Sequence, residues 1–454
     1  MNHLPEYFLA DLSPETLLQP GLITEACQTL KRNREQYLLP QSTDNLVRIL
    51  ANLGEQWCQP DFPFRQRVLQ ACPEKTGFSR ATLERGIDFF FSRLTVANLK
   101  ALMRQELGHE HRLDQWTASE IEQRQNRLAL VRGPELLVHL TAGNLPSPAW
   151  MSLILGLLTR SAQFLKPASD TSYLPLMLAH SLYEIAPKLA SCIEIAAWPG
   201  GTHDLENVLF SEADCVTVTG SDQTLKAVQA RLQPKTRFLG YGHRVSFAFV
   251  TSKALAQDGT SCIAKAAADD IAAWDQHGCL SPHVIYVENN PANPAEAFAE
   301  QLANALANVE EREPRAVLST EASAVIASRR SFYEIRAAFS PATLCWFSKN
   351  STAWSVVFEA DPLFQISCLN RFIYVKGVPQ LSEALQAAEA VRHHTSTVGL
   401  AAVQSEVRTL AAEIARWGAT RVCPLGQMQT PPLTWRHDGR PALGDLITWT
   451  DLET

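Results

Sequence analysis

The stretch ELLVHLTAGN, residues 135–144, is a short apolar run that ends in a turn of small and polar residues. Apolar runs of about four to eight residues bounded by turn residues are typical of strands buried in a parallel sheet. The same combination recurs three times, as QFLKP (163–167), IEIAAWPGG (193–201) and CVTVTGS (215–221). Helical patterns separate the runs, so the rhythm predicts an α/β sheet covered on both faces. Ligands of such sheets bind beyond the carboxyl ends of the strands. The turns found there contain Asn144, Lys166, Gly200 and Gly220.

The chain on either side of this region follows other patterns. Residues 1–115 are predicted to be mainly helical, because apolar residues recur at helical spacing from Leu83 to Leu94 after Ser79, a candidate helix cap, and Gly108 is a candidate stop. A second region of alternating strands and helices contains apolar runs at 246–250, 284–287 and 372–375. We therefore expect four parts: an N-terminal helical region (1–115), a parallel-sheet domain (116–245), a second α/β domain (246–420) and a C-terminal tail packed on another surface (421–454).

The composition narrows the class of protein. The chain has 454 residues, of which 46% are apolar and 19% charged, the balance of an ordinary globular protein. Its net charge of −7 gives no general attraction for nucleic acid. The longest apolar segment, Trp150 to Leu158, is too short to span a bilayer, and no signal-peptide pattern is present. The ten cysteines form no CxxC pair, so we expect reduced thiols in a cytoplasmic protein, without a metal site.

Cys279 lies in the setting that best suits chemistry. It belongs to WDQHGCLSP (274–282), a glycine-flanked turn between a predicted helix and the predicted strand at 284–287. A thiolate there would be a good nucleophile toward carbonyls and thioesters, with backbone N–H groups directed at the substrate. A single cysteine is, however, more often a small apolar core residue. His277 is a candidate acid or base, although a histidine in a turn is common.

Five short motifs follow one another in a suggestive order. They are Asn144-Leu145-Pro146, Lys166-Pro167, Pro199-Gly200-Gly201, Thr219-Gly220-Ser221 and Cys279. Together they resemble the aldehyde-dehydrogenase superfamily over residues 130–420, and the interval of 22 residues from Asn144 to Lys166 is close to the spacing there. Each motif alone is weak, but five in order are hard to obtain by chance. The resemblance implies a Rossmann-type parallel-sheet cofactor domain, a second α/β catalytic domain carrying Cys279, and an N-terminal helical region packed on the cofactor domain.

The resemblance also implies a role for each matching residue. Asn144 would donate its side-chain amide, and Cys279 its backbone N–H, to the oxyanion formed when the thiolate attacks. Lys166 would bind the adenosine ribose of the cofactor or its 2′-phosphate. Gly200 would belong to the cofactor site, and Gly220 with Ser221 would let the pyrophosphate approach a helix N-terminus. Each residue also has a plainer alternative, as a turn residue, a surface lysine or an ordinary helix start.

Two departures from the superfamily pattern narrow the chemistry. Hydrolytic members carry a glutamate that activates water, and the matching position here is Gly240, so this base is missing. An enzyme without it should exchange acyl groups with thiols and, by microscopic reversibility, reduce a thioester to an aldehyde. Ser169 stands where an acid often excludes a 2′-phosphate, which favours NADPH, although Asp170 is adjacent. A hydrolytic NAD(P)-dependent aldehyde dehydrogenase and a non-catalytic scaffold of the same fold are the competing interpretations.

Four further segments sharpen the resemblance. They are TGFS (76–79), HLTAGNLP (139–146), GCLSPH (278–283) and WRHDG (435–439). Within the superfamily they are most similar to the long-chain acyl-CoA reductases of bacterial bioluminescence fatty acid reductase complexes. This similarity implies NADPH-dependent reduction of a long-chain fatty acyl thioester, acyl-CoA or acyl-protein, through a thioester on Cys279. It also implies a homo-oligomer and, as partners, acyl-protein synthetase and acyl-transferase subunits. The sequence determines neither the acyl chain length nor the donor.

Overall fold

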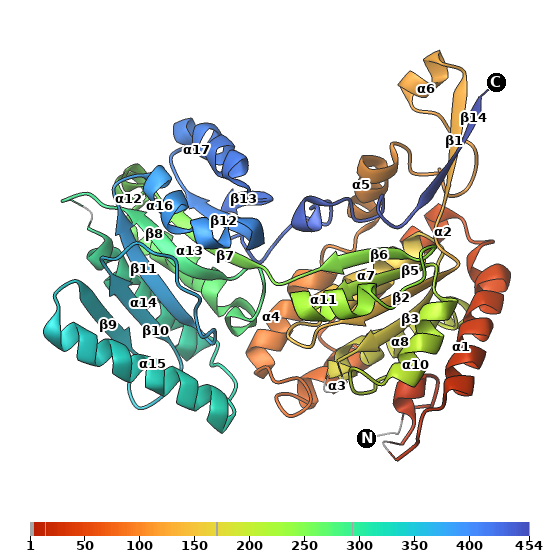
Figure 1. Cartoon of the computed structure of the whole chain (residues 1–454), viewed down its shortest axis with the longest axis horizontal. Helices are drawn as coiled ribbons and strands as arrows, with labels where there is room; N and C mark the ends of the chain where they lie inside the picture. The colour runs from red at the N-terminus through yellow and green to blue at the C-terminus, as the bar shows by residue number, and fades with distance from the viewer. Residues whose placement is uncertain (1–3, 14, 169–170, 293, 454) are drawn as a thin grey trace. The chain divides into compact units, whose positions relative to one another are not determined.

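The computed structural model describes residues 4–13, 15–168, 171–292 and 294–453 (Figure 1). The chain forms two compact units, each with its own sheet and its own apolar core. Unit 1 consists of Met1–Thr76, Ile87–Gly242 and Pro432–Thr454, and unit 2 of Gly77–Gly86 and His243–Pro431. Unit 1 is therefore assembled from segments that lie far apart in the sequence.

A five-stranded parallel sheet is the centre of unit 1. Its strands are β2 (Leu136–Thr141), β3 (Ala162–Pro167), β4 (Ile193–Ile195), β5 (Cys215–Thr219) and β6 (Arg237–Tyr241). They lie in the order β4-β3-β2-β5-β6, and all neighbours are parallel. Every residue of β2 and β3 is buried, as expected for strands covered on both faces. The predicted α/β sheet is confirmed, and it contains one strand, β6, that the apolar runs did not indicate.

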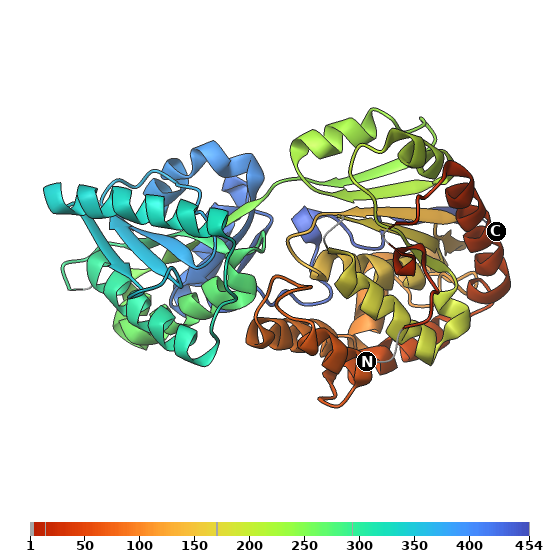
Figure 2. The ribbon, with the colours of Figure 1, turned by 90° about the horizontal axis from the view of Figure 1, so that it is seen from below.

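Helices surround this sheet. Those between its strands are α7 (Ser147–Leu158), α8 (Tyr173–Ile185), α9 (Pro187–Ala190), α10 (His203–Glu212) and α11 (Asp222–Gln229). Those that precede it in the chain are α1 (Pro20–Asn33), α2 (Thr43–Cys58), α3 (Pro63–Gln70), α4 (Arg80–Phe91), α5 (Val96–Leu107) and α6 (Glu120–Arg124), with short turns η1 (Leu9–Asp11) and η2 (Arg34–Leu38). In Figure 2 the red and orange N-terminal helices of unit 1 lie around its yellow strands. Ile23 and Leu30 of α1 share a core with Val138 and Phe164 of the sheet, so the predicted helical N-terminal region is confirmed.

The helix predicted after Ser79 is divided into two. α4 ends at Phe91, and α5 begins at Val96, where the Thr95 hydroxyl accepts a hydrogen bond from the Asn98 N–H at 3.2 Å. Gly108 ends α5 with a φ of 72°, a left-handed conformation that glycine adopts without strain. The apolar spacing was therefore correct for α4 but continued across a helix boundary, because Thr95 caps a new helix.

The most apolar segment of the sequence lies inside α7. Trp150, Leu153 and Leu157 are all buried in unit 1. At about 1.5 Å per residue, a helix of 12 residues is about 18 Å long, less than the hydrocarbon core of a bilayer. Among the helices of the described residues, none has both the length and the hydropathy that crossing a membrane would need.

The C-terminal residues of the chain return to unit 1. β1 (Arg127–Arg132) pairs with β14 (Thr448–Glu453) in an antiparallel ribbon that Figure 1 shows in orange and dark blue. Just before β14, Leu446 is buried against Leu137 and Leu239 of the sheet. The Arg237 guanidinium donates to the carbonyl of Asp445 at 2.9 Å and to that of Ile447 at 2.7 Å.

Unit 2 is built on a seven-stranded sheet. Its strands are β7 (Val245–Val250), β8 (Pro282–Glu288), β9 (Thr343–Phe347), β10 (Ser355–Glu359), β11 (Phe372–Val378), β12 (Thr395–Ala401) and β13 (Arg421–Pro424). They lie in the order β13-β12-β7-β8-β11-β10-β9, and every pair is parallel except β10 with β9. The surrounding elements are α12 (Ser252–Asp258), α13 (Thr260–Ala272), η4 (Ala273–Gln276), α14 (Ala295–Arg312), α15 (Thr320–Phe339), α16 (Leu381–Ala387), η5 (Glu389–His394) and α17 (Gln404–Trp417). Because β8 is the middle strand, the turn that precedes it starts from the centre of this unit.

Candidate active site

The sheet register of unit 1 aligns several candidate residues. Leu140 of β2 pairs with Lys166 of β3 on one side and with Val218 of β5 on the other, and Val218 pairs with Gly240 of β6. Lys166 and Gly240 therefore lie in the same row, near the carboxyl ends of their strands. The predicted turns follow these strands, so the sheet brings them to one edge, where ligands of parallel sheets bind.

Lys166 is a buried cation at this edge. Only 8% of the residue is exposed, and its ammonium lies 5.9 Å from the centre of the Trp198 ring. Burial lowers the pKa of Lys166, and the nearby Glu206 carboxylate opposes part of that shift. Lys166 forms no salt bridge with another described residue. A cation held in this way suits an anionic ligand group, which would offset the cost of its burial.

A carboxylate binds the backbone of the turn at Gly200 and Gly201. Glu206, which is buried, accepts a hydrogen bond from the Gly201 N–H at 3.0 Å and pairs with Arg231. Gly201 has a φ of 85°, which explains glycine at that position. A Cβ atom at Gly200 would meet nothing within 4 Å, so packing within the protein does not require glycine there. This leaves room for a ligand to approach the backbone.

The turn at Gly220 and Ser221 opens α11. The Ser221 hydroxyl accepts a hydrogen bond from the Thr224 N–H at 3.1 Å and caps the helix. The Gly220 N–H donates to the carbonyl of Tyr241 at 3.1 Å, which ties the turn to β6. The positive end of the α11 dipole therefore lies at the carboxyl edge of the sheet, an arrangement that attracts phosphate groups.

Asn144 and Cys279 belong to different units. Asn144 is exposed in the turn between β2 and α7 of unit 1, whereas Cys279 lies in unit 2. Their joint action on an oxyanion therefore stays a prediction. Ser169, expected to tolerate a 2′-phosphate, and its neighbour Asp170 lie outside the described residues.

Gly240 is an ordinary strand residue whose surroundings are crowded. A Cβ atom there would come within 2.8 Å of the Leu225 Cδ2 and 2.9 Å of the Phe238 ring. The C-terminal tail also packs on this part of β6. The Arg440 guanidinium donates to the Gly240 carbonyl at 3.2 Å, and the His437 ring stacks on Tyr241 at 4.8 Å. The segment WRHDG (435–439), whose role the sequence left open, thus reaches β6, the strand that contains Gly240.

Cys279 lies in a tight turn before β8. The carbonyl of Gly278 accepts a hydrogen bond from the Ser281 N–H at 2.9 Å, which closes the turn around Cys279. The Cys279 carbonyl accepts from the Ser246 hydroxyl of β7 at 2.7 Å, so the turn is tied to the neighbouring strand. Cys279 itself is half-buried. This arrangement fixes the backbone of the residue and leaves its side chain partly accessible.

Most other cysteines are poorly suited to act as nucleophiles. Burial raises the pKa of five of them to about 12: Cys27, Cys192, Cys215, Cys345 and Cys423. Burial also raises the pKa of Cys58 and Cys368. A thiol with such a pKa is almost entirely protonated at neutral pH, and the thiolate is the reactive form.

The surroundings of Cys279 include polar residues that the sequence did not single out. His277 Nε2 lies 3.0 Å from Asn370 Oδ1, and its ring contacts Phe78 edge-on at 6.3 Å. Asp275, just before it, is bound by Arg371. Asn370 and Arg371 lie more than 90 residues from Cys279 in the sequence. No local pattern links the two segments, and the only hint is that asparagine tolerates the left-handed conformation found at Asn370.

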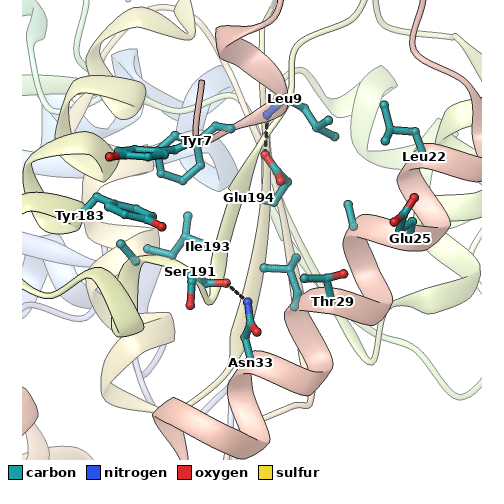
Figure 3. A pocket seen from close by; sticks show the side chains of 14 residues that line it. Tyr7, Leu9, Leu22, Glu25, Thr29, Asn33, Tyr183, Ser191, Ile193 and Glu194 are labelled. Carbon is teal, nitrogen blue, oxygen red and sulfur yellow. Dashed lines mark hydrogen bonds between the residues drawn. The ribbon is translucent and has the colours of Figure 1, made fainter. Parts of the chain in front are cut away.

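A cavity of about 280 Å³ lies elsewhere in unit 1, beside the edge strand β4 (Figure 3). Tyr7 and Tyr183, whose rings stack at 3.9 Å, line it together with residues of α1. Glu194 points into it and accepts hydrogen bonds from the N–H groups of Leu9 at 2.8 Å and Ile195 at 2.9 Å. Burial raises the pKa of Glu194 to about 7. None of the predicted site residues lines this cavity.

Comparison with known sequences identifies one family. The sequence model of a family described as "Acyl-CoA reductase (LuxC)" matches residues 38–449. A protein of Photorhabdus laumondii named long-chain acyl-protein thioester reductase is 22% identical over 421 residues, which are 90% of this chain and 82% of that protein. A protein of Vibrio harveyi with the same name is 22% identical over 423 residues, 92% of this chain and 84% of its own. The predicted resemblance is confirmed.

Solved structures show the same fold. An NAD-dependent benzaldehyde dehydrogenase from Corynebacterium glutamicum superimposes with a TM-score of 0.68 at 14% identity, over 96% of this chain and 91% of that one. An NAD-dependent aldehyde dehydrogenase from Sinorhizobium meliloti gives a TM-score of 0.66 at 14% identity, over 96% and 87%. At this identity the likeness concerns the fold alone, and it confirms the expected aldehyde-dehydrogenase-like architecture.

Proposed function

This chain belongs to the acyl-CoA reductase (LuxC) family, and we propose that it reduces a long-chain fatty acyl thioester to the aldehyde through a thioester on Cys279. The relatives in Photorhabdus laumondii and Vibrio harveyi are named for the reduction of acyl-protein thioesters. The proposed donor is accordingly an acyl group carried on the thiol of coenzyme A or on a partner protein. Acyl-protein synthetase and acyl-transferase subunits would be its partners, and the enzyme would act as a homo-oligomer.

The reaction divides into two steps at Cys279. The thiolate attacks the thioester carbonyl carbon, a C–S bond forms, and the bond to the donor sulfur breaks, so the donor leaves as a thiol after taking one proton. In the second step hydride reaches the acyl carbon and the bond to Cys279 Sγ breaks, which releases aldehyde and restores the thiolate. A bound reduced nicotinamide cofactor would supply the hydride. The Asn144 amide and the Cys279 N–H would stabilise the oxyanion in both steps.

The residues of unit 1 fit such a cofactor. Lys166 is a buried cation next to an aromatic ring, Gly200 leaves open space above its backbone, and Ser221 begins a helix at the same edge of the sheet. Lys166 would bind the ribose and its 2′-phosphate, and the α11 N-terminus the pyrophosphate. We propose NADPH over NADH because a buried ammonium gains most from a doubly charged phosphate.

The observation that carries the reductive direction is Gly240. It occupies β6 without a side chain, so the carboxylate that activates water in hydrolytic relatives is missing. A positioned base typically accelerates such a step by about 10²–10⁴-fold. The acyl-enzyme should therefore persist long enough to be reduced or to pass its acyl group to a thiol. Hydrolytic aldehyde oxidation is the competing function, and Gly240 disfavours it.

The test follows the acyl group without and then with the cofactor. Pure protein is exposed to a long-chain acyl-CoA, and peptide mass spectrometry should find the acyl adduct on Cys279. Addition of NADPH should release aldehyde, and addition of 2-mercaptoethanol should release the acyl thioester. Rapid appearance of free fatty acid in buffer alone, or an adduct on another cysteine, would contradict the proposal. A panel of chain lengths in the same assay determines the preferred acyl group.

A further inference from the structure

Two segments of unit 2 have a backbone conformation that is uncommon outside glycine. Trp274, Asp275 and Gln276, just before Cys279, have φ values of 53°, 50° and 69°. Leu369, Asn370 and Arg371 have φ values of 61°, 58° and 64°. Three consecutive non-glycine residues in the left-handed region are costly, and such strain persists only where the surroundings impose it. It tends to occur at functional sites.

The two left-handed turns are bound to each other. The Asn370 N–H donates to the Asp275 carbonyl at 3.1 Å, and Arg371 Nε donates to Asp275 Oδ1 at 2.9 Å. The Asn370 Oδ1 lies 3.0 Å from His277 Nε2, which places the ring hydrogen of His277 on Nε2, since the amide oxygen can only accept. Asp275 and His277 are thus each bound by a residue of the other turn, and Gln276 lies between them.

Gln276 joins both turns to the sheet. Its amide donates to the carbonyls of Pro282 at 2.8 Å and Phe372 at 2.9 Å, and its side-chain oxygen accepts from the Phe372 N–H at 2.9 Å. Pro282 begins β8 and Phe372 begins β11, which are neighbouring strands. The side chain of Gln276 is fully buried and its donors and acceptor are all used. The Cys279 turn is therefore fixed at both ends.

Buried charges reinforce the arrangement. Arg371 has no exposed surface, and its Nη1 also donates to Glu310 Oε2 of α14 at 2.7 Å. Asp275 is 3% exposed. A buried ion pair adds little to stability compared with apolar residues of the same size, because desolvation offsets the attraction. What it adds is a defined geometry, which is the property that a nucleophile requires.

We propose that the left-handed turn Leu369–Arg371 positions the Cys279 turn for acyl transfer, with Asn370 as a positioning residue that acts through His277. This inference rests on the proposed function, in which Cys279 accepts the acyl group. In this arrangement His277 acts as a hydrogen-bond donor to Asn370 through Nε2. A shift of about 1 Å in a reacting group can cost about 10²-fold in rate.

The test compares Asn370→Gly with Asn350→Gly in the full chain. Both asparagines belong to unit 2 and have left-handed φ values, 58° and 55°, so glycine affects the two backbones alike. Asn350 is exposed between β9 and β10 and serves as the matched control. The rate of adduct formation on Cys279 is measured against the concentration of a long-chain acyl-CoA, without NADPH. We expect Asn370→Gly to lower the limiting rate by about 10–100-fold with little change in half-saturation, and Asn350→Gly to leave both unchanged.

Two further measurements separate positioning from loss of structure. Iodoacetamide reacts with an accessible thiolate without the alignment that acyl transfer needs. Alkylation of Cys279 should therefore keep its rate in Asn370→Gly if the turn is misaligned, and should accelerate if the turn unfolds. His277→Gln keeps a side-chain donor for Asn370 and should acylate at most of the wild-type rate. His277→Leu has no such donor and should acylate as slowly as Asn370→Gly.

The inference is overturned if Asn370→Gly acylates at the wild-type rate, if faster alkylation accompanies its loss of acylation, or if His277→Gln is as slow as His277→Leu. Absence of an adduct on Cys279 in the wild-type chain is a separate outcome. It would overturn the proposed function, and this inference with it.

Discussion

Charge is treated in opposite ways around Lys166 and Glu194 of unit 1 and around Cys279 of unit 2. Lys166 is buried and Glu194 half-buried, and neither has a salt bridge to another described residue. Burial lowers the pKa of Lys166 and raises that of Glu194 to about 7. Beside Cys279, Asp275 and Arg371 are more completely buried, and they bind each other. Unpaired charge at a sheet edge suits a site that a ligand completes, whereas paired charge around Cys279 completes a site within the chain itself. Four variants test this contrast.

Cys279→Ala should have the largest effect. Removal of the nucleophile should abolish reduction of acyl-CoA, because no acyl-enzyme can form. Binding of NADPH, followed by its fluorescence, should be retained, since the candidate cofactor residues all belong to unit 1. Residual reduction by Cys279→Ala would show that another thiol is acylated. Cys262→Ala, which changes an exposed cysteine of the same unit, is the control and should keep full activity.

Arg371→Met should destabilise unit 2 by about 3–5 kcal/mol, because Asp275 would remain buried without its ion-pair partner and the half-buried Glu310 would lose an ion pair. Thermal unfolding followed by tryptophan fluorescence measures the change. Arg312→Met is the control, since Arg312 pairs with Glu313 at 2.9 Å while half-exposed and should contribute about 1 kcal/mol or less. Equal losses in the two variants would remove the distinction between paired charge that is buried and paired charge that is not.

Glu194→Gln should change how stability depends on pH. The folded pKa of Glu194, about 7, lies above its ordinary value of 4.5, so folding favours the neutral carboxyl. That contribution is present below pH 4.5 and is lost as the pH rises through about 7. Between pH 5 and pH 8 the free energy of unfolding of the variant should therefore rise by roughly 2 kcal/mol relative to that of the wild type. Denaturant unfolding at the two values measures this gain, and Glu25→Gln, an exposed carboxyl on the same cavity, should show none.

Lys166→Ala should have the smallest effect, which should fall mainly on the binding of NADPH. Loss of the ammonium should weaken the binding of NADPH by about tenfold and that of NADH by less, because charge-assisted hydrogen bonds to phosphate are among the stronger ones. Calorimetric titration with both cofactors measures the two changes. Lys188→Ala, at an exposed lysine of unit 1, should alter neither. If Lys166→Ala weakens both cofactors equally, the ammonium does not contact the 2′-phosphate.

The sheet of unit 1 was predictable because its strands are uniformly apolar and each ends at a turn. β2, β3 and β5 therefore appear in the sequence almost with their observed bounds. The predicted run at 193–198 is longer than β4, which ends at Ile195. β6 was not predicted, since Arg237, Gly240 and Tyr241 interrupt its apolar pattern and only Leu239 is buried.

The ribbon of β1 and β14 and the outer strands of unit 2 were not predicted. All six residues of β14 are exposed, so no burial pattern marks the strand, and backbone pairing with β1 alone defines it. In unit 2 the runs at β7, β8 and β11 were apolar enough to predict. β9 and β10, which pair with each other in antiparallel fashion, were not predicted. Strand pairing is a long-range property that a local pattern does not contain.

The surroundings of Cys279 mark the limit of prediction for the candidate site. Cys279, Lys166 and the glycine turns could be found because each lies in a short motif. Asn370 and Arg371 could not, because their contacts with His277 and Asp275 join segments more than 90 residues apart. Left-handed φ values at tryptophan, aspartate and glutamine also leave no trace in the sequence.

The pairing of β1 with β14 has a consequence for synthesis on the ribosome. β1 leaves the ribosome before residues 243–431 of unit 2 are made, and its partner strand leaves only after them. At about 5–20 residues per second, β1 waits for some tens of seconds. During that interval the edge of β1 and the apolar surface later covered by Leu446 are open to other chains. A nascent chain stalled before residue 432 should therefore depend on chaperones more than the released protein does.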